Sequence, residues 1–567
     1  MQIIRVVVSL ILIVLVHCWF DWYNNQPKDV GSDVPSGKLR SLSFAPYREG
    51  YSPLEKIYPL PEHIEEDLQI LADKTETIRT YSSLAGMQPT PDLARKYGIK
   101  MIQGGWLGNG HKENRLEVEA LIKSANENAD VVQRVIIGNE VLLRGDLDID
   151  HLIGYIREVK RSVKQPVSYA DVWSMYMKYP QLIKEVDFIT IHILPYWEDE
   201  PISVQNASDH LEKVVKQVED EARGIAPGKP ILIGESGWPS AGRQRGLAIP
   251  NVVNEAKFIR DLIEVANRHN FDYNIVEAFN QPWKSNLEGV VGANWGLISV
   301  DRKPVFSLTG LVSENPQWLL GFVEASLLLG LIVAAFFKKL QSLPLTRLML
   351  FLILAQIISV CLVTLANYLW FTSYSPWQRA YTVAMVSANA LLAGLIVLRC
   401  SNVLHDSAEE FKLARWLRSI YILFILLALY KTYGLGINGR YLSFPLEQFS
   451  IPVIGICGLI ICLGLTRRNL NGRIFAFDQL VGWSLHTQRD RLIAYLLTFA
   501  IFAMVAGETK AFLDGRDFIH AHPGISEGLP VALSYTLNNQ QLQLWLVYLF
   551  FLSVPFWTNT GNKNQTG

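Results

Sequence analysis

The most prominent pattern along the chain is a set of apolar stretches about as long as a membrane is thick. A helix needs roughly 20 mostly apolar residues to cross a bilayer. Eight stretches approach that length, and seven of them fall in the second half of the 567 residues. We predict membrane spans near 4–22, 318–337, 347–371, 377–398, 416–434, 450–466, 491–508 and 541–557.

The first stretch has two interpretations. It begins near a lone Arg5, as a secretory signal peptide does. However, it continues into Cys18-Trp-Phe-Asp-Trp-Tyr23, where bulky aromatic residues stand in place of a small-residue cleavage site and suit a membrane interface. We therefore favour an uncleaved anchor. The chain then divides into a transmembrane anchor at 1–30, a central domain at 31–316 and a polytopic region of about seven helices at 317–567.

The basic residues of the short loops predict the orientation of these spans. Cytoplasmic loops carry an excess of Lys and Arg. The loops after the second, fourth and sixth spans hold twelve such residues, whereas the alternate loops hold three, Arg440, Lys510 and Arg516. The first set is therefore expected in the cytoplasm. This places the central domain outside the cytoplasm and predicts a multi-pass protein of the cell (inner) membrane with a periplasmic domain.

Between 31 and 316 short β-rich runs alternate with amphipathic stretches of helical period. Eight strands with intervening helices in about 240 residues are typical of a (β/α)8 barrel. An open doubly wound sheet is the alternative, but no Gly-rich phosphate-binding turn follows the first strand. The predicted fold class is α/β, a (β/α)8 TIM barrel followed by an all-α multi-span transmembrane region. The predicted strands are 42–46, 77–81, 100–104, 132–138, 167–170, 188–192, 230–234 and 275–279.

Composition narrows the possible chemistry. The formal net charge of −1 gives no basic footprint for nucleic-acid binding. None of the five cysteines falls between 30 and 316, so the central domain has no disulfide framework or thiolate metal site. Its histidines lack ligand spacing such as His-x-x-x-His. We therefore predict neither a metal nor another cofactor.

Two glutamates stand at the ends of predicted strands on opposite sides of the barrel. Glu140 ends the fourth strand and Glu235 ends the seventh. Polar residues at the carboxyl ends of barrel strands project into the active site. Two carboxyl groups facing each other there suit glycoside hydrolysis, in which one acts as an acid and the other as a nucleophile or base. We expect Glu140 and Glu235 to be the catalytic pair.

Four short motifs lie at or beside predicted strands of the central domain. They are Ser43-Phe-Ala-Pro-Tyr47, Ile78-Arg-Thr-Tyr81, Ile137-Gly-Asn-Glu140 and Gly234-Glu-Ser-Gly-Trp-Pro-Ser240. In these motifs the domain resembles glycoside hydrolase family 17, the β-1,3-glucanase and glucanosyltransferase family.

By this resemblance Glu140 is the acid/base and Glu235 the nucleophile of a retaining enzyme. The resemblance covers about 40–316 and leaves the transmembrane region unexplained. Asn280 and Gln281 depart from the acidic residues that family members often carry before the Pro-Trp pair, which affects expected substrate contacts.

Other polar and aromatic residues at strand ends are candidates for binding substrate. Asn139 is placed to bond a sugar 2-hydroxyl. Glu277 has a second interpretation, as a partner that holds Arg79. Aromatic side chains in the loops can stack on the apolar faces of sugars, or simply pack within the barrel; Trp106, Trp173 and Trp197 belong to this group. The predicted substrate-binding residues are Tyr47, Arg79, Tyr81, Asn139, His192, Tyr196, Trp238, Glu277 and Trp283.

The expected function is that of a retaining glycosidase or transglycosidase that acts on β-1,3-glucan in envelope glucan synthesis or remodelling, with the formation of β-1,6 linkages as one option. A plain endo- or exo-β-1,3-glucan hydrolase is the first alternative. A non-catalytic glucan-binding sensor or transporter component is the second. The expected partners are a β-glucan oligo- or polysaccharide, the lipid bilayer and a membrane glucan synthase.

Overall fold

The computed structural model describes residues 2–467, 472–483 and 489–558 of the chain. It divides into two compact units. One unit is Pro27–Glu314, and the other combines Met1–Gln26 with Asn315–Gly567. We describe each unit by itself.

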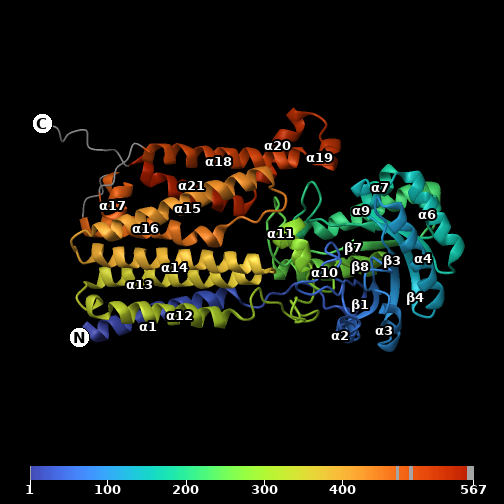
Figure 1. Cartoon of the computed structure of the whole chain (residues 1–567), viewed down its shortest axis with the longest axis horizontal. Helices are drawn as coiled ribbons and strands as arrows, with labels where there is room; N and C mark the ends of the chain where they lie inside the picture. The colour runs from blue at the N-terminus through green and yellow to red at the C-terminus, as the bar shows by residue number, and fades with distance from the viewer. Residues whose placement is uncertain (1, 468–471, 484–488, 559–567) are drawn as a thin grey trace. The chain divides into compact units, whose positions relative to one another are not determined.

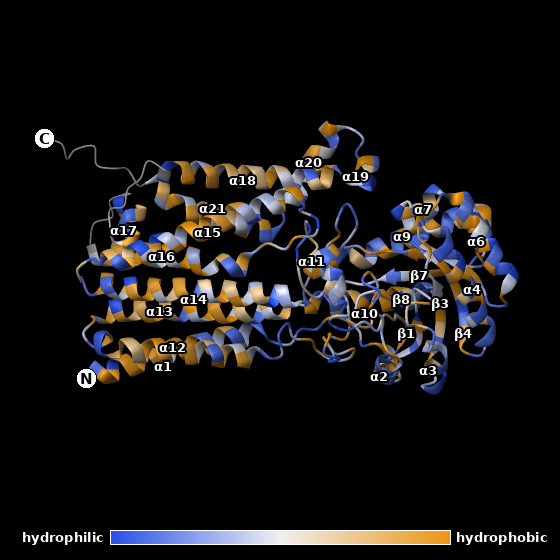
Figure 2. Cartoon of the chain, viewed as in Figure 1, coloured by the Kyte–Doolittle hydropathy of each residue, from blue (hydrophilic) through white to orange (hydrophobic). Residues whose placement is uncertain are grey.

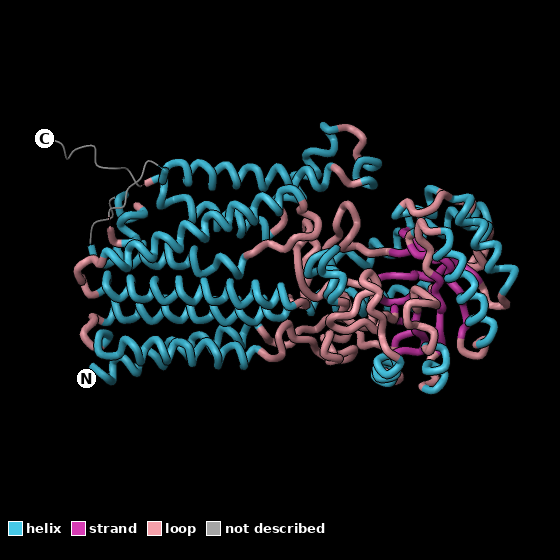
Figure 3. Tube along the Cα trace, in the orientation of Figure 1, coloured by secondary structure: helices cyan, strands magenta, loops and turns pink. Residues whose placement is uncertain are grey.

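The first unit is a closed barrel of eight parallel strands in sequential order (Figure 1). All strands of the described chain belong to this barrel, as Figure 3 shows in magenta. This confirms the predicted TIM-barrel class. The strands are β1 (Leu39–Ser43), β2 (Thr75–Arg79), β3 (Lys100–Gly105), β4 (Val132–Asn139), β5 (Val167–Val172), β6 (Ile189–His192), β7 (Ile231–Ser236) and β8 (Asp272–Ile275).

Helices connect the strands and cover the outside of the barrel. Most have one apolar face and one polar face, as Figure 2 shows for α4, α6 and α9, and the apolar face packs on the strands. The main helices are α2 (Pro61–Leu71), α3 (Thr90–Lys96), α4 (His111–Glu127), α5 (Val141–Arg144), α6 (Ile149–Ser162), α7 (Trp173–Lys178), α8 (Leu182–Glu185), α9 (Ala207–Ile225), α10 (Val252–His269) and α11 (Ser285–Ala293). Three 3-10 turns lie at Pro35–Gly37, Val204–Asn206 and Pro282–Lys284.

The barrel interior is filled by side chains. Ile102, Ile136, Ala170, Phe188 and Leu232 form a buried cluster separate from the main core. They come from β3, β4, β5, β7 and the residue before β6, as expected of side chains that point into the barrel. The barrel is therefore packed, and its chemistry has to lie at a rim.

The chain enters and leaves the barrel unit at neighbouring points. Lys28 and Val312 form an antiparallel bridge, with N–H···O distances of 2.8 and 3.0 Å. Arg260 of α10, which is 3% exposed, donates to the carbonyl oxygens of Gly31 and Gly310 at 3.1 and 2.8 Å. A single buried guanidinium thus holds the incoming and outgoing segments together.

The second unit is a bundle of long apolar helices, orange over most of their length in Figure 2. Seven helices of the described chain are long and apolar enough to cross a membrane. They match the first seven predicted spans. The eighth predicted span, 541–557, forms α21 but is not among the seven, because glutamines dilute its first turn. The helices are α1 (Gln2–Asn24), α12 (Trp318–Leu340), α13 (Leu345–Phe371), α14 (Pro376–Leu404), α15 (Phe411–Ile437), α16 (Leu446–Arg467), α17 (Phe477–Val481), α18 (Arg489–Leu513), α19 (Arg516–Ala521), α20 (Ile525–Leu537) and α21 (Gln540–Trp557), with a 3-10 turn at Gly472–Phe475.

Helix α1 is joined to the other helices of this unit by polar contacts. Arg5 donates to the carbonyl oxygens of Gln341 and Leu343 at 2.9 and 2.6 Å. Farther along, a ring nitrogen of His17 lies 2.8 Å from the side-chain amide nitrogen of Gln356 on α13. In apolar surroundings an unpaired polar group costs free energy, so such contacts favour one position of α1 against its neighbours. The N-terminal helix is therefore an integral member of the bundle.

Candidate active site

The carboxyl ends of four strands bring four predicted residues together. Arg79 ends β2, Asn139 ends β4 and His192 ends β6, while Glu235 is the penultimate residue of β7. In a closed parallel barrel all these ends lie at one rim. All four residues are buried. Together they form a buried polar cluster at the rim, above the apolar interior of the barrel.

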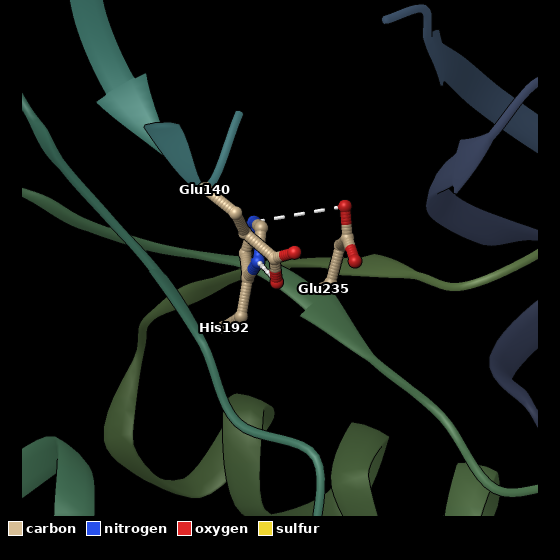
Figure 4. Close-up of side chains that lie close together, drawn as sticks. All are labelled: Glu140, His192 and Glu235. Carbon is tan, nitrogen blue, oxygen red and sulfur yellow. Dashed lines mark hydrogen bonds and ion pairs between the residues drawn. The ribbon is translucent and has the colours of Figure 1, made fainter. Parts of the chain in front are cut away.

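Glu140 occupies an unusual corner of the backbone. It directly follows β4 and has φ 53° and ψ 31°, in the left-handed region. Non-glycine residues there cost of order 1 kcal/mol, and such residues gather at functional sites. The corner is held by a hydrogen bond from the Glu140 N–H to the carbonyl oxygen of Ala170, at 2.8 Å. In Figure 4 the Glu140 side chain points toward His192 and Glu235.

Glu140 and Glu235 face each other with His192 between them (Figure 4). The Nδ1 atom of His192 lies 2.9 Å from Glu140 Oε1, and its Nε2 atom lies 3.7 Å from Glu235 Oε1. One oxygen from each carboxylate and one ring nitrogen all lie within 4.8 Å of one another. That spacing is close to the roughly 5 Å separation of retaining glycosidases and shorter than the 6.5 Å or more of inverting ones.

Arg79 links the nucleophile candidate to the end of β4. Its Nη1 atom donates to the carbonyl oxygen of Gly234 at 2.7 Å and lies 3.2 Å from Glu235 Oε1. Its Nη2 atom donates to Asn139 Oδ1 at 2.6 Å. This buried guanidinium therefore fixes the Glu235 carboxylate relative to the residue that directly precedes Glu140. The side chains of Glu140, His192 and Glu235 are spaced closely enough to hold a cation. At Glu235, however, the Arg79 guanidinium already supplies a positive charge.

The pKa of the Glu140 carboxyl reflects burial opposed by its neighbours. Burial alone would raise this pKa. The hydrogen bond and charge of His192, followed by the charges of Arg144 and Arg79, hold it below its ordinary value. These neighbours therefore favour the ionised form of a carboxyl group that burial alone would keep protonated.

A second group of charges lies beside β8. Glu277 is 1% exposed, and Lys284 Nζ lies 2.8 Å from its Oε1 atom. Burial raises the pKa of Glu277 to about 7, although Lys284 opposes the rise. The alternative in which Glu277 holds Arg79 is wrong, since the carboxylate bonded to Arg79 is that of Glu235.

The aromatic candidates fall into two groups. Tyr47 and Trp283 lie edge to face with ring centroids 6.1 Å apart, and Tyr81 lies under the Arg79 guanidinium at 4.9 Å. Tyr196 and Trp238, in contrast, are fully buried and bond the backbone carbonyls of Arg243 and Ile249. Their rings pack on each other at 6.1 Å. The prediction that Tyr196 and Trp238 bind substrate is therefore corrected, because both are enclosed in the core.

Comparison with known proteins identifies the barrel. Residues 41–296 match the family model described as the BtgE/BtgC glycoside hydrolase domain. The barrel is a glycoside hydrolase domain. This confirms the resemblance to family 17 stated from the sequence motifs.

Relatives of this glycoside hydrolase domain have related names. A glucan 1,3-β-glucosidase of Arthroderma benhamiae is 29% identical over 266 residues, which cover 44% of this chain and 85% of that protein. A probable β-glucosidase btgE of Neosartorya fischeri is 28% identical over 275 residues, 46% of each chain. The match thus spans less than half the length of the btgE protein. A solved glycoside hydrolase family 17 β-1,3-glucanosyltransferase from Rhizomucor miehei is 29% identical, with a TM-score of 0.41 over 48% of this chain and 96% of that one.

The glycoside hydrolase domain also contains site residues that we did not predict. Lys284 and Asp171 are the clearest cases. Asp171 lies on β5, accepts a hydrogen bond from the Tyr169 hydroxyl, and is close enough to Glu140 for the two charges to interact. A predicted strand that ended at Ala170 left Asp171 outside the set of strand-end residues. Its position directly after the predicted strand 167–170 was the signal available in the sequence.

Asp171 gives a pH-dependent prediction. Burial raises its pKa from 3.8 to about 6; the Tyr169 hydroxyl opposes this rise and the Glu140 charge adds to it. Between these values the folded domain holds a proton that the unfolded chain releases, so stability falls as the pH rises through this window. Relative to Asp171→Asn, the wild-type domain should lose on the order of 2 kcal/mol, roughly 5 °C in melting temperature.

The measurement is thermal unfolding of the full-length wild type and Asp171→Asn between pH 4 and pH 7, followed by tryptophan fluorescence. The exposed Asp209→Asn on α9 serves as the matched control, and its curve should stay parallel to that of the wild type. Parallel curves for Asp171→Asn would contradict the prediction.

Proposed function

We propose that the protein is a membrane-anchored, retaining β-glucan glycosidase or transglycosidase. The observation that carries the proposal is the pair Glu140 and Glu235, whose nearest carboxylate oxygens lie within 4.8 Å across one barrel rim. A water molecule that attacks directly needs a wider gap between the carboxylates. The spacing supports attack on the sugar by one of the carboxylates themselves.

In the proposed mechanism Glu235 attacks the anomeric carbon while Glu140 protonates the departing glycosidic oxygen. The glycosidic bond breaks, and a covalent glycosyl-enzyme forms on Glu235. Glu140 then removes a proton from the acceptor, whose oxygen attacks the anomeric carbon and releases Glu235. Arg79 supports the role of Glu235 by holding its Oε1 atom at 3.2 Å. Asn139 accepts from Arg79 through Oδ1, which leaves its amide N–H groups to donate to the sugar.

The proposed substrate is a β-1,3-glucan. The support is the match to a glucan 1,3-β-glucosidase over 85% of that relative. The acceptor decides the reaction. Water gives hydrolysis, and a sugar hydroxyl gives transfer, including β-1,6 branches if the 6-hydroxyl attacks. We favour transfer, in envelope glucan synthesis or remodelling.

The proposed location is the cell (inner) membrane, with the catalytic domain in the periplasm. Seven candidate spans and the bias of basic residues toward alternate loops support this orientation. The helical unit would bind the lipid bilayer and could dock a membrane glucan synthase. An enzyme held at the membrane would meet new glucan as it leaves such a partner.

The test uses the full-length protein in detergent with laminari-oligosaccharides. Products are identified by mass and by linkage, and the anomer formed first is read by NMR. A β-anomer is expected as the first product of a retaining enzyme. Longer or branched products mean a transferase, and only shorter ones mean a hydrolase. No change in any β-glucan, or an α-anomer as the first product, would overturn the proposal.

A further inference from the structure

Trp106 is an exposed aromatic residue on an immobile loop. It directly follows β3 and is 43% exposed. Among the described residues of the barrel unit it is the only aromatic side chain in the exposed class. Single exposed apolar residues are common and need no explanation by themselves. The surroundings of Trp106 are what make it informative.

Three buried side chains fix the loop that carries Trp106. Glu117 of α4 accepts a hydrogen bond from the Trp106 backbone N–H. Asn114, 1% exposed, exchanges two hydrogen bonds with the backbone of Gly108, at 2.9 and 2.7 Å. Leu107 is completely buried. The indole is thus presented to solvent by a backbone with little freedom, which is the condition for binding at a low entropic cost.

Arg144 supports the indole from the side of the acid/base residue. Its guanidinium carbon lies 4.4 Å from the centre of the Trp106 ring. The guanidinium is itself fixed by bonds to the carbonyl oxygens of Asn139 and Leu107 and to Asp146. Since Asn139 directly precedes Glu140, the indole and the acid/base residue are tied to the same corner of the barrel.

The side of the site that Glu140 occupies has a defined role in a retaining enzyme. Glu140 protonates the leaving sugar and later deprotonates the acceptor, so both sugars occupy the side next to it. An indole face stacks well on the apolar face of a glucosyl ring. We propose that Trp106, held by Arg144, is the platform that binds a glucosyl residue of the acceptor chain and thereby favours transfer over hydrolysis. This inference rests on the proposed function.

The test measures how the glycosyl-enzyme partitions between sugar and water. The full-length protein receives β-glucosyl fluoride as donor, and laminaritriose is varied as acceptor. Fluoride release counts every glycosyl-enzyme formed, and mass spectrometry counts the transfer products. For Trp106→Ala the ratio of transfer to hydrolysis should fall about tenfold, and the half-saturating laminaritriose concentration should rise about tenfold.

Two further variants separate stacking from folding. Trp106→Phe keeps an aromatic face and should recover most of the transfer ratio. Leu116→Ala, which removes a 51% exposed leucine on α4, should leave the ratio unchanged. The inference is overturned if Trp106→Ala keeps the wild-type ratio, if Phe restores nothing, or if the wild type releases fluoride without any transfer product. A wild type that releases no fluoride would remove the proposed function itself, together with this inference.

Discussion

Replacing Glu235 with Gln is expected to lower glucan turnover by on the order of 10⁴-fold or more, because the amide cannot form the glycosyl ester. The variant should still fold, since the Gln carbonyl oxygen can accept the hydrogen bond from Arg79 that Glu235 Oε1 accepts at 3.2 Å. Turnover of laminari-oligosaccharides by the full-length protein measures the effect. A melting temperature close to that of the wild type would show that the loss is chemical.

Covalent labelling provides a second test of the nucleophile role expected of Glu235. A 2-deoxy-2-fluoroglucosyl donor with a good leaving group slows breakdown of the intermediate, so the wild-type protein should gain the mass of one glycosyl group. Glu235→Gln should gain none. Glu219→Gln, at an exposed position on α9, is the matched control and should label as the wild type does. Unchanged glucan-dependent function in Glu235→Gln would instead support the non-catalytic sensor or transporter alternative.

Replacing Glu140 with Gly is expected to lower turnover of natural β-glucans by 10²- to 10⁴-fold, the usual contribution of a general acid. Glycine suits the position because the backbone there has φ 53°. A donor whose leaving group departs without a proton, such as β-glucosyl fluoride, should still form the glycosyl-enzyme. The defect should therefore be much larger for laminari-oligosaccharides than for the fluoride.

Azide provides the second measurement for Glu140→Gly. The azide anion needs no general base, so it should attack the anomeric carbon, release Glu235 and yield β-glucosyl azide. Formation of this product in the variant, and its absence in the wild type, would assign the acid/base role to Glu140. Equal losses on both donors with no azide product would show that the residue has another role.

The sequence predicted the barrel because its strands are buried on both faces and therefore read as short apolar runs. It placed the first and last strands about three residues late. Phe44 follows β1, and Ala278 and Phe279 follow β8, yet all three are buried. Apolar character marks burial, and at these two positions the burial continues after strand pairing has ended.

The proximity of Glu140 and Glu235 was predictable because strand order alone places the ends of β4 and β7 across the rim. The direction in which each side chain points could not be predicted from the sequence. Tyr196 and Trp238 follow strands just as Trp106 does, but two of the three turn inward. Side-chain pairings that depend on how a loop folds could not be predicted from the sequence either. Nothing in the pattern pairs Glu277 with Lys284 rather than Arg79, because that choice depends on how the loop after β8 folds back.

The contacts of Arg260 with the incoming and outgoing segments bear on how the barrel is joined to the rest of the chain. A domain whose two ends meet can be inserted into a loop of another protein while both folds survive. Lys28 and Val312 are hydrogen-bonded neighbours, so the whole barrel behaves as one insertion between α1 and α12. On this view the helical bundle is the host fold and the glycoside hydrolase domain is the inserted unit. A different domain whose two ends lie close together could therefore be inserted at the same place, between α1 and α12.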